Sequence, residues 1–163
     1  IKKLRQRPGG EKTRFYVPLG LKKWFAIRGV DQVIEMDWWD RHQDGNLEII
    51  AVPVQHWSKR SLFSRNKTLW AGWVINANAF RFIFVGDTGY TPHFKEIDEK
   101  LGPFDLAAVP IGAYAPRAMM QASHMNPEEA WRAAMARVSS LEARPPRGKR
   151  RNSSCSRVVE NRK

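Results

Sequence analysis

The chain contains a single cysteine, Cys155, among its 163 residues. One cysteine cannot form a disulfide within the chain, and it excludes a metal site built from cysteines alone. Long apolar runs are also absent, because the longest stretch without a charged residue, Thr68–Phe80, is far shorter than the ~20 apolar residues that cross a bilayer. The chain opens on Ile1 without an initiator methionine or a signal-peptide pattern, so we expect a segment upstream to be missing.

Acidic residues are scarce, with 16 Asp and Glu against 28 Lys and Arg, and the formal net charge is +12. The excess is concentrated near the C-terminus: Arg132–Lys163 carries a net charge of +8, and the preceding 131 residues carry only +4. Strong basicity is typical of nucleic-acid binders, and here that inference applies only to the C-terminal part. Seven Trp and eight Phe exclude a chain that is disordered throughout.

Short apolar segments alternate with amphipathic ones, which predicts one α/β layered domain. Most of the predicted strands are continuously apolar, as in sheets covered on both faces. Residues Asp40–Asn46 are polar and predict a loop, and residues 1–14 predict a surface connection. We expect strands at Arg14–Pro18, Val33–Met36, Leu47–Val54, Leu69–Ile75, Phe80–Val85 and Phe104–Ile111, and helices at Leu19–Gly29, Thr91–Leu101 and from Asn126 onward.

The pattern changes near residue 137. Residues 138–163 contain no aromatic side chain and no sustained apolar period, and they include the run Arg144–Ser154, which is rich in Arg, Pro and Ser. This composition predicts a basic, disordered tail. An alternative explanation is that the tail is out of frame or foreign to the fold. We therefore divide the chain into a domain over 1–137 and a basic tail over 138–163.

Two polar residues follow apolar strands directly. His56 comes after Leu47–Val54, and Asp87 comes after Phe80–Val85. Catalytic groups of open α/β sheets gather beyond the carboxyl ends of strands, and His with Asp suits a cation such as zinc. The simpler alternatives are a turn Asp that accepts backbone N–H bonds and an imidazole that is hydrogen-bonded near Trp57.

Seven sequence blocks around these residues make the pattern more specific. In order, they resemble the N-acyl-phosphatidylethanolamine-hydrolysing phospholipase D-like branch of the metallo-β-lactamase superfamily. The resemblance runs from about Arg14 to Ala133. The blocks are Tyr16–Leu21, Glu35–Trp39, Gln55–Trp57, Phe84–Tyr90, Gly102–Ala108, Pro110–Tyr114 and Asn126–Ala130.

The resemblance implies a partial αβ/βα sandwich, with two mixed sheets covered by helices and two zinc ions at one edge. It implies that His56 is a metal ligand, that Asp87 bridges both ions, and that the two together are catalytic. The family's His-x-His-x-Asp-His signature is absent, because no two of the four histidines are separated by one residue. The final histidine of the family is also missing after the helix that begins at Pro127. Because two ligands cannot hold two zinc ions, we expect this chain alone to be inactive.

Other residues near these blocks are candidates for substrate contact. The family often has a histidine at the position of His124, near the mouth of the active site, and the alternative is a hydrogen bond at the helix entry. Tyr114 and Arg117 follow the strand at Phe104–Ile111, and Arg117 could bind a phosphate or lie on the surface. His42 is expected in solvent, and His93 is expected to be structural.

Three functions remain open at this point. The resemblance favours a zinc-dependent phosphodiesterase acting on phospholipid-like substrates, with peripheral membrane contact. A second possibility is a hydrolase of the same fold acting on lactones, lactams or nucleic acid. The third is a non-enzymatic module that binds nucleic acid or anionic membrane through its basic tail. The free cysteine and the lack of an export signal suit the cytoplasm or a membrane surface, and the cell envelope is left open.

Overall fold

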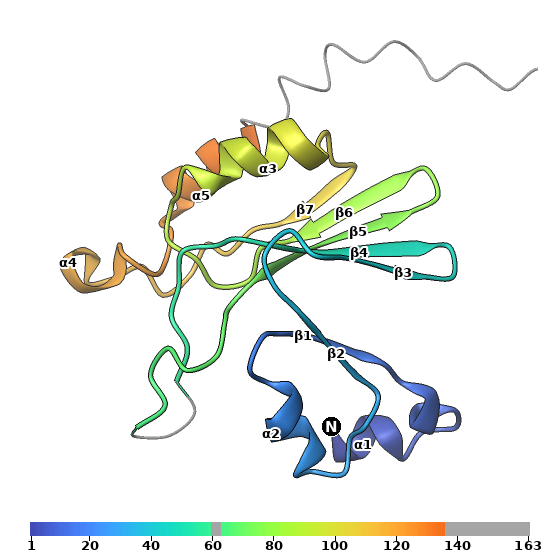
Figure 1. Cartoon of the computed structure of the whole chain (residues 1–163). Helices are drawn as coiled ribbons and strands as arrows, with labels where there is room; N and C mark the ends of the chain where they lie inside the picture. Colours follow the sequence, from blue (N-terminus) through green and yellow to red (C-terminus); the bar gives the residue numbers. More distant parts are fainter. Residues whose placement is uncertain (60–62, 136–163) are drawn as a thin grey trace, which may run out of the picture.

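The computed structural model describes residues 1–59 and 63–135. The predicted tail over 138–163 lies outside the described residues, so its disorder and its foreign origin remain predictions. The described part contains a two-stranded sheet, a five-stranded sheet and helices on the far face of the larger sheet (Figure 1). None of the described helices is long and apolar enough to cross a membrane.

The N-terminal segment forms a small parallel β-α-β unit. Strand β1 pairs with β2 in parallel, and α2 connects them. Val17, Leu21, Val30 and Val33 form the buried core of this unit. Residues 1–14 include two short helical turns, where the sequence predicted only a surface connection, and α2 is shorter than the predicted helix. The elements are α1 (Lys2–Arg5), η1 (Gly10–Lys12), β1 (Phe15–Pro18), α2 (Lys22–Ala26) and β2 (Val33–Met36).

The larger sheet has the strand order β3-β4-β5-β6-β7. All neighbouring strands are antiparallel except β6 and β7, which are parallel. The hairpin predicted around Asn76–Asn78 is confirmed, since β5 and β6 are joined through Asn78 and Ala79. The strands are β3 (Arg41–Asp44), β4 (Leu47–Val52), β5 (Gly72–Ala77), β6 (Phe80–Phe84) and β7 (Leu106–Ala108).

The prediction of a polar loop over Asp40–Asn46 is wrong. Residues Arg41–Asp44 form the edge strand β3, and Asp44 pairs with Leu47 across a tight turn in which Gly45 has φ +60°. An edge strand needs only backbone pairing with one neighbour, so its side chains can stay polar, and strand prediction from apolar runs misses it. The last strand, β7, is shorter than predicted, and at its C-terminal end Pro110 has no N–H with which to extend the pairing to Ile111.

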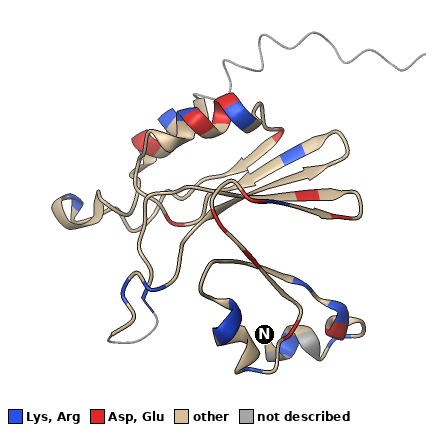
Figure 2. Ribbon diagram, viewed as in Figure 1, with Lys and Arg blue, Asp and Glu red and all other residues tan. Residues whose placement is uncertain are grey.

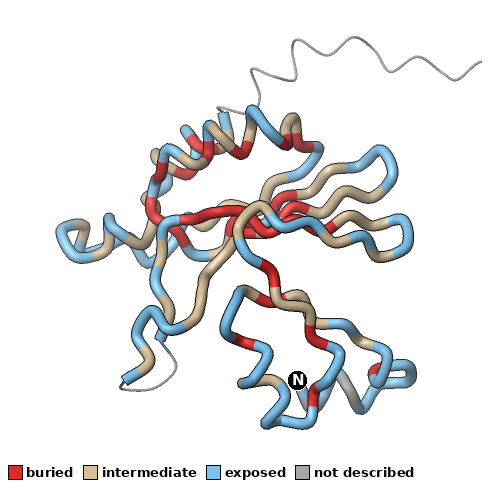
Figure 3. Tube along the Cα trace, in the orientation of Figure 1, coloured by how far each residue is buried: buried red, intermediate tan, exposed pale blue. Residues whose placement is uncertain are grey.

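Strand β4 explains why an apolar run was visible in the sequence. Ile50 and Val52 face the helices, and Ile49 and Ala51 face the two-stranded sheet. Both faces are therefore covered, as expected for a central strand that carries apolar residues at successive positions. Figure 3 shows the buried residues concentrated along this strand and on the inner side of the helices.

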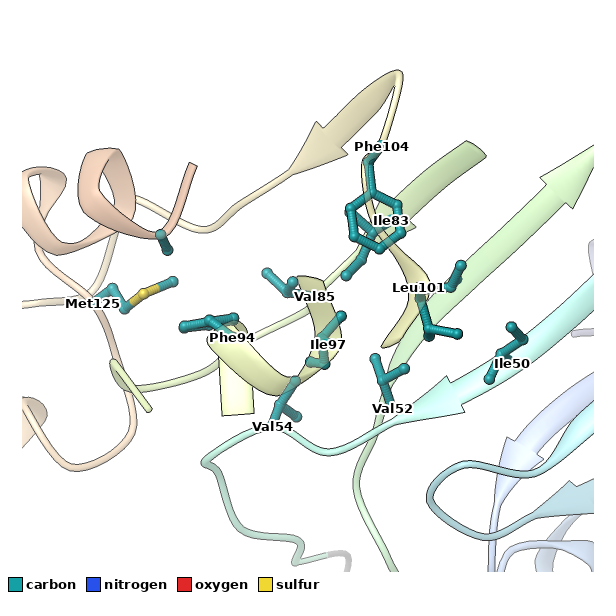
Figure 4. Packing of buried hydrophobic residues seen from close by; sticks show 12 residues of the cluster. Ile50, Val52, Val54, Ile83, Val85, Phe94, Ile97, Leu101, Phe104 and Met125 are labelled. Carbon is teal, nitrogen blue, oxygen red and sulfur yellow. The ribbon is translucent and has the colours of Figure 1, made fainter. Parts of the chain in front are cut away.

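Two helices, α3 (His93–Leu101) and α5 (Pro127–Met135), cover the outer face of the sheet. Helix α3 contributes Phe94, Ile97 and Leu101, spaced three and four residues apart, to the same core as Ile83 (Figure 4). Its outer face pairs Lys100 with Glu96 at 2.7 Å, and both signs of charge are interspersed along it (Figure 2). In the sequence, the short helix α4 (Arg117–Met120) lies between α3 and α5, and in the structure it lies to one side of them (Figure 1).

The predicted start of the helix at Asn126–Glu129 is confirmed. The Glu129 backbone N–H donates to the Asn126 side-chain oxygen at 2.8 Å, and the Asn126 N–H donates to the Glu129 carboxylate at 3.1 Å. This reciprocal pair satisfies two N–H groups that the helix leaves without intrahelical partners. The cap thus fixes where α5 begins and how the preceding residue, Met125, enters the core.

Asp44 at the end of β3 joins the two sheets. Its carboxylate accepts a hydrogen bond from the Tyr16 hydroxyl at 2.6 Å and forms an ion pair with Arg14. The Tyr16 hydrogen bond, aided by the Arg14 guanidinium, holds the pKa of Asp44 below its ordinary value. A carboxyl whose folded pKa is lowered adds stability above its unfolded pKa and loses that contribution as pH falls through the folded pKa.

We therefore expect Asp44→Asn to lower the free energy of unfolding at pH 7 and to leave it unchanged at a pH below both pKa values of Asp44. Denaturant unfolding of both chains between pH 7 and pH 2 measures this difference. Glu99→Gln is the matched control, because the ion pair that the structure describes for Glu99, with Lys95 at 3.8 Å, is exposed to solvent. An Asp44→Asn difference that stays constant over this pH range would contradict the assignment.

Candidate metal centre

The segments that follow β4 and β6 meet at one edge of the large sheet. Because β5 lies between these strands and is antiparallel to both, β4 and β6 run in the same direction and end at the same side. Beyond their ends, the Gly89 N–H donates to the Gln55 carbonyl at 2.8 Å. His56 and Asp87 line one pocket of about 320 Å³ there, together with Pro18 and Leu21 from the smaller unit. The topology thus brings the two predicted site residues together.

The imidazole of His56 is held in one orientation. Its Nδ1 lies 2.8 Å from the carbonyl oxygen of Trp57, and the Trp57 ring stacks on it with an interplanar angle of 9°. A carbonyl only accepts, so Nδ1 carries a proton and donates it, and Nε2 then has a free lone pair whenever the imidazole is neutral. This Nε2 is buried and has no hydrogen-bond partner among the described residues.

A buried nitrogen without a partner is costly, and a lone pair presented in a pocket is what a metal ion requires. In metal-binding histidines, the ring nitrogen that does not bind the metal usually donates a hydrogen bond to a carbonyl or a carboxylate, as Nδ1 of His56 does here. The hydrogen bond near Trp57, proposed from the sequence as an alternative to metal binding, is therefore present and compatible with it.

Asp87 lies in the turn after β6, where Gly86 has φ +66°. The side-chain hydrogen bonds that the structure describes at this turn are made by Thr88, which is completely buried. The exposed Asp87 lines the His56 pocket, and it also lines a second pocket of about 440 Å³ with Phe84, Ala108 and other residues. Thr88 rather than Asp87 thus stabilises the turn, in contrast to the sequence-based alternative.

These two side chains suit a metal ion but do not complete its coordination. Imidazole nitrogen and carboxylate oxygen are both zinc ligands, and a zinc ion normally takes three or four protein ligands. Within residues 1–59 and 63–135, no three His, Cys, Asp or Glu side chains gather closely enough to hold a metal. The roles of His56 and Asp87 as ligands therefore remain a prediction.

His124 lies beside His56, with ring centroids 5.3 Å apart and the rings nearly perpendicular. Arg117 at the start of α4 holds this segment, because its Nη1 donates to the His124 carbonyl at 2.9 Å and its Nη2 pairs with Glu129. These contacts give Arg117 a positioning role, and its predicted contact with phosphate remains a prediction. Tyr114, 41% exposed, lies in the segment between β7 and α4.

The two remaining histidines lie away from this arrangement. His42 is on β3, half-buried, with its ring 5.3 Å from that of Tyr16. His93 is the first residue of α3, and its Nδ1 is 3.5 Å from Glu96.

Tryptophans support one wall of the His56 pocket. Trp70 Nε1 donates to the Val54 carbonyl at 2.8 Å, and Trp38 Nε1 donates to the Trp70 carbonyl at 2.7 Å. Trp57 is 40% exposed and stacks on His56. These three tryptophans thus combine ring packing with backbone hydrogen bonds at the pocket.

Comparison with known proteins identifies the family of this chain. Residues 1–140 match the family described as the beta-lactamase superfamily domain. The N-acyl-phosphatidylethanolamine-hydrolyzing phospholipase D 1 of Caenorhabditis elegans is 44% identical over 127 residues, which are 72% of this chain and 36% of that protein. The mitochondrial N-acyl-phosphatidylethanolamine-hydrolyzing phospholipase D of Saccharomyces cerevisiae is 36% identical over 143 residues, which are 83% of this chain and 30% of that protein.

Among solved structures, the metallo-β-lactamase fold protein YhfI from Bacillus subtilis aligns with a TM-score of 0.53 and 15% identity, over 77% of this chain and 49% of that one. At this identity the similarity concerns the fold. The chain spans about a third of the length of the two phospholipases D that it matches.

Proposed function

The chain belongs to the beta-lactamase superfamily domain family, a hydrolase family with the metallo-β-lactamase fold, and to its N-acyl-phosphatidylethanolamine-hydrolysing phospholipase D-like branch; from this premise we propose that it forms part of a zinc-dependent phosphodiesterase acting on N-acyl-phosphatidylethanolamine-like lipids. The observation that carries the proposal is the buried His56 Nε2, which has no hydrogen-bond partner among residues 1–59 and 63–135, on the pocket that Asp87 also lines. The remaining ligands would come from outside the described residues.

Each residue of the site has a defined task in this proposal. His56 would bind a metal through Nε2, with its ring fixed by the Trp57 carbonyl. Asp87 would bridge two metals, since each carboxylate oxygen can bind one ion and a single imidazole nitrogen cannot. When bound, a pair of zinc ions supplies an activated water and offsets the charge that develops on phosphorus. His124 lies beside His56, where it would contact substrate.

The second pocket supports a substrate with an apolar part. It shares the lining residue Asp87 with the His56 pocket, and its other lining includes the apolar Phe84, Val109 and Pro110. A phosphodiester positioned at Asp87 would therefore have apolar surface directly beside it. This arrangement suits a lipid better than a nucleic acid, whose phosphates are flanked by sugars and by further charge.

Zinc titration of the chain, followed by NMR of the histidine side chains, tests the site directly. We expect weak zinc binding that shifts the His56 signals, because the described part of the chain brings only these two candidate ligands to the pocket, together with no measurable phosphodiester turnover. His56→Ala should abolish this binding, whereas His42→Ala on β3 should preserve it. Zinc binding that is unaffected by His56→Ala would contradict the site, and stoichiometric paired zinc with turnover would contradict the incomplete ligand set.

A further inference from the structure

Three segments of the candidate site are tied to one another through residues that would not touch the metal. Gln55 precedes His56, Thr88 follows Asp87, and Ala122 lies two residues before His124. In the sequence these segments are about 30 residues apart. In the structure, hydrogen bonds connect all three.

Thr88 is at the centre of this arrangement. Its hydroxyl accepts from the Gln55 backbone N–H at 2.9 Å and donates to the Gly89 carbonyl at 2.8 Å. The Gly89 N–H in turn donates to the Gln55 carbonyl at 2.8 Å. The Thr88 side chain is completely buried, so water cannot replace these partners without a rearrangement of the turn.

Gln55 extends the connection to the third segment. Its side-chain Nε2 donates to the Ala122 carbonyl at 2.9 Å, although the residue itself is exposed. Gly89 packs against the same peptide, because a Cβ placed there would lie 2.9 Å from the Ala122 oxygen and 3.0 Å from that of Gln121. The backbone of residues 121–122 therefore contacts the Asp87 turn closely and is also hydrogen-bonded to the His56 segment.

We propose that Thr88 and Gln55 are positioning residues that hold His56, Asp87 and His124 in one geometry for metal and substrate binding. The proposal rests on the function proposed above. The Trp57 carbonyl fixes the orientation of the His56 ring, and the Thr88 hydroxyl, together with the Gly89–Gln55 backbone hydrogen bond, fixes the position of the His56 backbone relative to Asp87. A metal ion is bound tightly only when its ligands are held at the right separation. Mutation of residues that hold the ligands in place typically lowers metal affinity 10- to 100-fold.

The test compares Thr88→Val, which removes the hydroxyl at nearly constant volume, with Thr88→Ser, which keeps it. In zinc titrations of the 163-residue chain we expect Thr88→Val to weaken binding about 10-fold and Thr88→Ser to restore it. Thr91→Val is the matched control. Thr91 is also buried, but its hydroxyl accepts only a 3.5 Å contact from the His93 N–H at the start of α3. We expect this control to keep the zinc affinity of the wild type.

A metal-free measurement separates this proposal from the proposed function. Backbone hydrogen exchange at Gln55 should accelerate in Thr88→Val and not in Thr88→Ser, since Gln55 N–H loses its acceptor only in the first. If Thr88→Val does not fold, Gln55→Leu is the second variant, because Gln55 is exposed and its change should displace the His124 ring signals.

The outcomes are distinct. Unchanged exchange at Gln55 in a folded Thr88→Val chain would overturn the proposal, as would zinc affinity equal to that of the wild type. If Thr88→Val does not fold, unmoved His124 signals in Gln55→Leu would overturn it. Absence of zinc binding at His56 in the wild type would instead overturn the proposed function, and with it the role toward the metal.

Discussion

Asp87→Asn is expected to remove phosphodiester hydrolysis and most of the bound metal in a full-length relative that carries the complete set of ligands. The amide keeps the shape of the side chain and loses the negative charge that lets one group bind two cations. Losing metal stabilisation worth several kcal/mol corresponds to a rate reduction of about 10³-fold, since each 1.36 kcal/mol is a factor of ten. Metal content and turnover of the purified variant provide the measurement.

The matched control for this change is Asp31→Asn. Asp31 lies in the loop before β2, outside both pockets that Asp87 lines. It should therefore keep the metal content and turnover of the wild type. Activity of Asp87→Asn within tenfold of the wild type would show that Asp87 does not bridge metals in this branch.

The positions of His56 and Asp87 directly after two strands were predictable, because both strands are visible as local sequence patterns. Leu47–Val54 and Phe80–Val85 were recognisable as apolar runs, and Asn76–Asn78 as a hairpin turn. A strand inserted between them makes their ends coincide, which places His56 and Asp87 at one edge. The start of the helix at Asn126 was equally visible, since it depends on residues that are close together in the sequence.

Features that depend on pairing between distant segments were not predictable. Strand β3 has no apolar run, and only its backbone bonds to β4 make it a strand. Thr88 was part of a recognised turn, but its acceptor role toward Gln55 requires the register of segments 33 residues apart. The only local signal for the site at this turn was a polar residue directly after a buried strand. That signal indicated Asp87, and the hydroxyl beside it proved to stabilise the turn.

The basic tail provides the last test, because it separates the enzyme from the non-enzymatic module. Residues 138–163 contain six Arg and two Lys against two Glu, a net charge of +6. If all eight cations contacted the phosphates of duplex DNA, affinity would fall by about 10³- to 10⁵-fold between 50 and 200 mM salt. We expect the whole chain to bind a duplex with this steep salt dependence and a chain ending at residue 137 to lose it. Fluorescence anisotropy at several salt concentrations measures both.

Zinc binding at His56 should not change on the same deletion. The pocket is lined by residues between Pro18 and Asp87, so removal of residues 138–163 leaves every described wall in place. The shortened chain should therefore keep the zinc affinity of the whole chain and lose the salt-dependent binding to DNA. A control chain in which the six tail arginines are replaced by glutamine keeps all 163 residues and should also lose DNA binding. Salt-dependent DNA binding that persists in the chain ending at residue 137 would place the nucleic-acid surface on the folded domain and would favour the nucleic-acid hydrolase over the lipid phosphodiesterase.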